Sequence, residues 1–200
     1  MHSFFETNKK KTKWDETTFN EIIIYIHKIA SKFCKEYDII KTYFGAQNKE
    51  NFLTTFIKTF LEENFGKAVA REAINGHGKV DIMLFFKNNI QHPIECKRYD
   101  GERSLEMLYQ QINRHTTVDN KTVSMIIYCE SKNFTQSIIN IIKWMNYNIS
   151  FIKPPILNFN NYSNVFKGKF KHDYGHIMIL HCAFYHLYFD QDHAKRKPKK

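Results

Sequence analysis

Three ionisable side chains fall in a region of the sequence that otherwise has the pattern of buried strands. Asp81 lies in "KVDI", and Glu95 and Lys97 lie two residues apart in "HPIECKRYDG". On a strand, that spacing places Glu95 and Lys97 on one face of the sheet and turns Cys96 to the other. Charges on a largely apolar strand are costly unless a partner binds them. A Glu-x-Lys pattern alone is more typical of a surface ion pair, so the interpretation depends on the surrounding elements.

The elements around these residues are predicted from apolar periodicity. Helices are expected at 15–36, 49–64, 102–117 and 134–146. Strands are expected at 67–74, 79–86, 92–99 and 122–130, followed by two or three weaker strands between 150 and 189. The strand at 122–130 is almost continuously apolar, as in strands that are buried on both faces. This order predicts an α/β fold with a central mixed sheet of four to five strands flanked by helices.

The predicted topology brings the acidic residues together. If 79–86 and 92–99 form a hairpin, Asp81 near the start of one strand lies opposite the end of the other, close to Glu95. Two neighbouring carboxylates repel each other and are expensive to bury unless a divalent cation holds them. Oxygen ligands of this kind suit Mg²⁺ or Mn²⁺, and a nearby ammonium can offset charge that develops on a phosphate. The residues therefore predict metal-assisted hydrolysis of a phosphodiester.

These residues, in this order, resemble the PD-(D/E)xK nuclease superfamily, which has the restriction-endonuclease-like fold. Asp81, Glu95 and Lys97 match the D…ExK pattern, and Val80 stands where the name-giving motif has proline. The resemblance covers residues 50–145. It implies a Mg²⁺-dependent (or Mn²⁺-dependent) endonuclease in which Asp81, Glu95 and the carbonyl of Cys96 hold the metal. Lys97 is expected to position or activate the attacking water.

The resemblance extends to the helix that follows the Glu-x-Lys strand. In "EMLYQQINRH", Gln111 and His115 fall at the family's matching positions, with histidine in place of the more usual tyrosine. The resemblance implies that Gln111 orders the water or the scissile phosphate.

Members of the family often supply a further acidic residue from an earlier element. The candidates are Glu50, Glu62, Glu63 and Glu72. Glu72 is slightly favoured, because its strand is expected to pair with the strand of Asp81.

The charge balance agrees with a polyanionic partner. The chain carries a formal charge of +10 and has a pI near 9.3, which favours polyanionic partners such as nucleic acid or an acidic membrane. The resemblance implies nucleic acid, DNA more than RNA. The basic runs 8–13 and 195–200 are typical of solvated tails. The side chains expected to grip the backbone are Lys79, Arg98, Arg103 and Arg114.

Two other kinds of function stay open. The chain is alternatively a nucleic-acid-binding or regulatory module on the same fold, inactive without a partner, because a fold does not guarantee an activity. In a third interpretation the chain is an interaction domain, in which the helix at 15–36 packs on a second copy in a homodimer. By analogy with bacterial nucleases of this type, restriction or anti-phage defence is the expected biological role.

The whole chain is expected to form one nuclease-like domain. It divides into a helical N-terminal extension (1–45), the family-like core (46–150), additional strands (151–190) and a basic tail (191–200). The four cysteines are widely scattered, which argues against a zinc knuckle or a disulfide framework and favours a reducing, cytoplasmic setting. No apolar run approaches the length of a membrane span, so no membrane partner is expected.

Histidines cluster near the C-terminus, at 172, 176, 181 and 186, with Cys182 among them. Strand alternation would scatter these side chains over both faces of a sheet, so packing is favoured over a zinc site.

Overall fold

The computed structural model describes residues 24, 28, 49–65, 69–85, 90–157 and 164–187. Its helices are α3 (Lys49–Phe65), α4 (Glu102–His115) and α5 (Phe134–Asn148). Its strands are β1 (Val69–Asn75), β2 (Gly78–Phe85), β3 (Gln91–Arg98), β4 (Thr122–Cys129), β5 (Ile156–Leu157), β6 (Val165–Lys171) and β7 (Ile177–His186). Between residues 49 and 148, the predicted helices and strands are confirmed to within a few residues at each end. The helix predicted at 15–36 lies outside the described residues, except that positions 24 and 28 are helical; both basic tails also lie outside them.

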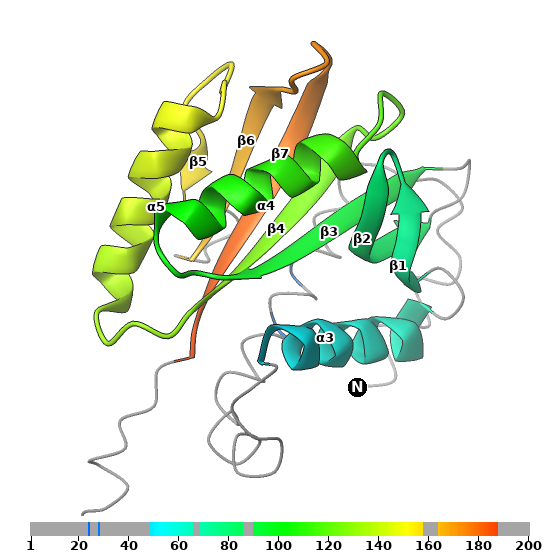
Figure 1. Cartoon of the computed structure of the whole chain (residues 1–200), viewed down its shortest axis with the longest axis horizontal. Helices are drawn as coiled ribbons and strands as arrows, with labels where there is room; N and C mark the ends of the chain where they lie inside the picture. Colours follow the sequence, from blue (N-terminus) through cyan, green and yellow to red (C-terminus); the bar gives the residue numbers. More distant parts are fainter. Residues whose placement is uncertain are drawn as a thin grey trace, which may run out of the picture.

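The strands form a single mixed sheet in the order β1-β2-β3-β4-β7-β6-β5 (Figure 1). The pairs β3–β4 and β4–β7 are parallel, and the remaining neighbours are antiparallel. The α/β fold with a mixed sheet flanked by helices is therefore confirmed. The prediction of four to five strands in that sheet was wrong, since the described residues alone contribute seven. The C-terminal strands extend the central sheet because β7 pairs along the whole length of β4.

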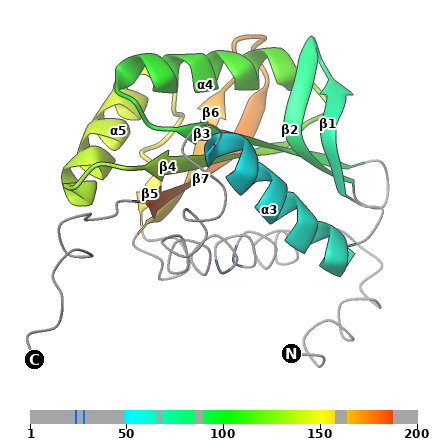
Figure 2. The same ribbon diagram turned by 60° about the horizontal axis from the view of Figure 1, so that its bottom comes forward.

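The helices cover opposite faces of the sheet. Figure 2 shows α4 and α5 on one face and α3 on the other. β4 lies in the middle and all of its residues are buried, which explains its unbroken apolar sequence. The main core packs residues of α4 such as Leu108 and Ile112 against Met125 and Ile127 of β4.

This packing places the key side chains of β3 on the α4 side. Glu95 pairs with Met125 and Lys97 pairs with Ile127. Residues paired across adjacent strands point to the same face, so Glu95 and Lys97 share the face that α4 covers. Cys96 faces the α3 side, as the alternation predicted.

None of the helices within the described ranges is long and apolar enough to cross a membrane.

Candidate active site

The candidate site begins where β2 and β3 separate. The two strands pair from Phe85–Gln91 to Ile82–Ile94, and no pairing continues beyond that point. At the next position Asp81 Oδ2 instead accepts a hydrogen bond of 2.8 Å from the backbone N–H of Cys96. A carboxylate thus takes the place of a strand partner. The predicted approach of Asp81 to the end of β3 is present in the structure.

A second carboxylate satisfies the next free amide of β3. Glu50, in the first turn of α3, accepts a hydrogen bond of 2.9 Å from the backbone N–H of Arg98 through Oε2. Its Oε1 lies 3.0 Å from Lys97 Nζ. Buried strand amides need partners, and here Asp81 and Glu50 supply them along the free edge of β3. The separation of the strands therefore draws two acidic groups to one place.

Glu50 is the early acidic residue that the structure brings to Lys97. Glu62 forms a surface ion pair with Lys58, and Glu63 is exposed. Glu72, which sequence reasoning slightly favoured, occupies a position in β1 beside β2, and its side chain lies outside what the structure describes. Sequence reasoning weighed strand pairing and could not foresee that the start of α3 reaches the end of β3.

Glu95 is the most deeply buried charged group of the site. It is 1% exposed, and its Oε1 lies 2.8 Å from His115 Nδ1. Its Oε2 is buried and meets no hydrogen-bond donor among the described residues, and the carboxyl group of Asp81 lies close enough to share a hydrogen bond with Glu95 when one of the two groups is protonated. Burial raises the pKa of Glu95 to about 7; the hydrogen bond with His115 opposes this rise, and the negative charge of Asp81 adds to it. A cation beside Oε2 would offset the cost of ionising this group.

The pKa of Asp81 is also shifted by burial and by neighbouring carboxylates. Burial raises its pKa, the hydrogen bond from the Cys96 amide lowers it, and the carboxylate of Glu50 raises it. Three carboxyl groups thus surround one small region, with Lys97 as the cation shown in contact with them. Such an arrangement is poorly neutralised by protein groups alone and favours a bound cation.

The turn between β1 and β2 holds His115 in place. A Cβ atom on Gly78 would lie 2.3 Å from His115 Nε2, so only glycine allows the ring its position. His77 N–H donates to the carbonyl of Arg114 (2.7 Å), and Asn75 Nδ2 donates to the carbonyl of His115 (2.6 Å). The "NGHG" turn between β1 and β2 therefore also anchors the end of α4. This anchoring function was missed, because it needs the tertiary contact.

Gln111 lies one turn before His115 on the same face of α4. Because α4 returns the chain from the end of β3 to the start of the parallel β4, it runs antiparallel to β3. A step of four residues along a helix is about 6 Å, and a step of two along a strand is about 6.6 Å. Because His115 contacts Glu95, Gln111 lies opposite Lys97, one helical turn and two strand residues further along. Gln111 Oε1 is buried and, within the described ranges, has no hydrogen-bond partner.

The four predicted nucleic-acid-binding cations do not form one cluster. Arg98 and Arg103 lie where β3 ends and α4 begins, whereas Arg114 lies at the last turn of α4, close to Lys79 just after the β1–β2 turn. Eleven residues of helix separate Arg103 from Arg114, which is about 16 Å. The side chains of Lys79, Arg98 and Arg114 are exposed. These cations therefore bracket the site from both ends of α4.

The residues present fit the predicted divalent cation. Among the described residues, no group of three or more His, Cys, Asp or Glu side chains has metal-binding geometry. Mg²⁺ is commonly held by one or two carboxylates with water completing its shell, and Asp81 and Glu95 supply that number. The N–H of Cys96 faces β2, and the carbonyl of a strand residue points to the same side as its N–H. That carbonyl would supply a third protein oxygen, and Oε2 is the oxygen that Glu95 would present to the metal.

Two of the four C-terminal histidines are buried, and the other two, His176 and His186, are partly exposed. His172 is buried, contacts Thr116 Oγ1 at 2.9 Å and stacks on His176 with 4.4 Å between ring centres. His181 is buried on β7.

No protein-family model, curated protein or solved structure matches this chain.

Proposed function

We propose that this protein is a divalent-metal-dependent endonuclease that hydrolyses phosphodiester bonds in DNA, on a restriction-endonuclease-like fold. The observation that carries the proposal is the gathering of Asp81, Glu95, Lys97 and Glu50 where β2 and β3 separate, with one buried carboxylate oxygen left open. An open anionic oxygen beside a lysine suits a metal ion and a phosphate.

Each residue has a role in this proposal. Asp81, Glu95 and the carbonyl of Cys96 would hold Mg²⁺ or Mn²⁺, which when bound would lower the pKa of a water molecule and withdraw charge from the phosphate. Lys97 is held by Glu50 at 3.0 Å, and it would donate to the attacking water or to a phosphate oxygen. Gln111, at the same level, would direct its open amide oxygen to the water. His115 orients Glu95 and is a positioning residue.

The test is cleavage of plasmid and single-stranded DNA with Mg²⁺, with Mn²⁺ and with EDTA. Asp81→Ala and Lys97→Ala are each expected to slow cleavage by about 100-fold or more, the usual scale for loss of a group that acts on the proton or the charge of the transition state. The matched controls are Asp119→Ala, in the exposed α4–β4 loop, and Lys169→Ala, on the exposed side of β6. Both controls should cleave like the wild type.

Two outcomes contradict the proposal. Cleavage that persists in EDTA, or that survives Asp81→Ala, would remove the metal from the mechanism. A wild-type chain that binds DNA in EDTA but cuts nothing with either metal would support the alternative, a binding or regulatory module that needs a partner.

A further inference from the structure

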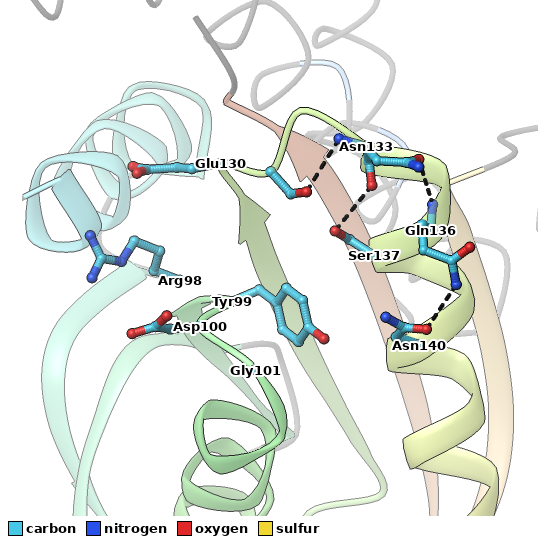
Figure 3. A pocket seen from close by; sticks show the side chains of 10 residues that line it. Arg98, Tyr99, Asp100, Gly101, Glu130, Asn133, Gln136, Ser137 and Asn140 are labelled. Carbon is cyan, nitrogen blue, oxygen red and sulfur yellow. Dashed lines mark hydrogen bonds between the residues drawn. The ribbon is translucent and has the colours of Figure 1, made fainter.

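A hollow of about 540 Å³ opens beside the candidate site (Figure 3). It lies at the carboxyl ends of β3 and β4, between the loop 98–101 and the start of α5. The carboxyl ends of parallel strands are where α/β proteins commonly bind ligands. Pockets for small organic groups usually measure about 300–1,000 Å³, so this hollow is large enough for a nucleoside-sized group.

The hollow adjoins the proposed catalytic site through the backbone at the end of β3. Arg98 lines it, and the backbone N–H of Arg98 is the group that Glu50 Oε2 accepts at 2.9 Å. Lys97 is the preceding residue. A nucleic-acid strand with its scissile phosphate at Lys97 would therefore place an adjacent nucleotide at the hollow.

The charge of the lining disfavours a phosphate there. Asp100 and Glu130 contribute two carboxylates, against the single guanidinium of Arg98. Like charges in a partly enclosed site repel, so a phosphate would be poorly held. An uncharged group that carries N–H donors fits better, because carboxylates accept hydrogen bonds from the amino groups of bases.

An aromatic ring from the end of β3 and side-chain amides of α5 complete the lining. Figure 3 shows Tyr99 reaching from the end of β3 toward α5, where Gln136 and Asn140 face the hollow. Gln136 Nε2 donates to Asn140 Oδ1 at 2.9 Å, and Asn140 also forms a hydrogen bond with the side chain of Tyr99. Each amide has more donors and acceptors than these bonds use. Stacking on aromatic rings combined with hydrogen bonds to base edges is how proteins read unpaired bases.

We propose that this hollow binds an unpaired nucleobase of the strand that is cut, stacked on Tyr99 and hydrogen-bonded to the amides of α5. The inference rests on the proposed nuclease function and narrows its substrate to nucleic acid with an unpaired or single-stranded nucleotide beside the scissile phosphate. Adenine and cytosine, which carry exocyclic amino groups, should be preferred over thymine at that position. A base within a duplex would first have to be extruded, at a cost of a few kcal/mol.

The test measures binding in EDTA, where no cleavage occurs, with single-stranded oligonucleotides that contain the fluorescent base 2-aminopurine. Stacking should quench the fluorescence. Tyr99→Leu should weaken binding by about 5- to 150-fold, the range for loss of one stacked base, whereas Tyr99→Phe should retain it. The matched control is Tyr147→Leu, because Tyr147 is 91% exposed on α5. Thermal unfolding of each variant verifies folding.

A second measurement tests base preference. The affinity ratio of oligo-dC to oligo-dT should exceed one in the wild type and fall toward one in Asp100→Leu, which removes a carboxylate acceptor from the lining. Equal affinity for paired and single strands, no effect of Tyr99→Leu, or no effect of Asp100→Leu on the ratio would each overturn the inference. In that case, metal-dependent cleavage that is lost in Asp81→Ala would still support the proposed nuclease activity, without the base-binding site. Conversely, quenching without cleavage would sustain the base site and remove the proposed nuclease activity.

Discussion

At the scale of single residues, Glu95 shows how one side chain meets opposing demands. Its burial opposes ionisation and raises its pKa to about 7, while the proposed activity needs the carboxylate. Glu95→Gln removes the charge with little change of shape. We expect loss of metal-dependent cleavage together with a higher unfolding temperature in EDTA at pH 8, by about 2–4 °C for each kcal/mol regained. Calorimetry and the cleavage assay measure the two effects. A Glu95→Gln variant that unfolds at a lower temperature than the wild type and still cleaves DNA would contradict both expectations.

His92 provides a separate prediction about acid stability. Its Nδ1 lies 2.8 Å from Thr122 Oγ1 and its Nε2 lies 2.9 Å from Ser124 Oγ. Burial lowers the pKa of His92 to about 3, although the hydrogen bond with Thr122 opposes the shift. The unfolded chain takes up this proton near pH 6.5 and the folded chain does not. Its contribution to stability is therefore complete above pH 6.5 and is lost as the pH falls toward 3.

The variant His92→Gln isolates this effect. Urea unfolding at pH 7.5 and pH 5 should show that the wild type loses more unfolding free energy over this interval than the variant does. The other titrating groups are common to both proteins and cancel in the comparison. Equal losses would show that His92 does not titrate in this way.

At the scale of elements, the contact between the β1–β2 turn and α4 can be tested directly. Gly78→Ala would force a Cβ to within 2.3 Å of the His115 ring, so the turn or the ring must move. Overpacking of this kind costs about 1–3 kcal/mol, and displacement of His115 should also slow cleavage. The control is His77→Ala, in the same turn, where the side chain is exposed and the backbone hydrogen bond remains. If Gly78→Ala unfolds at the same urea concentration and cleaves at the same rate as His77→Ala, the turn does not anchor His115.

Most elements were predictable because their signals are local. The short apolar runs of β2 and β3, the apolar stripe of α4 and the continuous apolar run of β4 each follow from residues close in sequence. The addition of β7 to the central sheet was not predictable in this way, because strand pairing between distant segments leaves no local signal. The hydrogen bonds of Glu50 to β3 span more than forty residues and were hidden for the same reason.

The residues of the candidate site likewise fall into those with a local sequence signal and those without one. Asp81, Glu95 and Lys97 were identified by residue type, spacing and resemblance. The contact of His115 with Glu95 depends on how α4 lies across β3, and the choice of Glu50 over Glu72 depends on where α3 begins. Neither is encoded in a short stretch of sequence.

At the scale of the whole molecule, charge should govern binding of nucleic acid. Each phosphate contact that is removed should lower the slope of log affinity against log salt by about 0.9 for duplex DNA. Arg98→Gln and Arg114→Gln, at the two ends of α4, should each reduce the slope and weaken binding to all sequences similarly. Lys171→Gln, exposed on β6, is the control. Fluorescence anisotropy at several salt concentrations measures the slope, and unchanged slopes in both arginine variants would place the duplex elsewhere.

The strand order also sets a sequence of events during folding. The strands β1 to β4 are neighbours in both chain and sheet, so this half can assemble through short connections. The other half joins only through the β4–β7 pairing, for example of Met125 with Cys182, after α5 and the β6–β7 hairpin are made. Long-range pairings of this kind carry the entropy of closing a large loop. The candidate site, where β2 and β3 separate, thus belongs to the half with the shorter connections, and the β4 edge of that half stays unpaired until β7 adds to it.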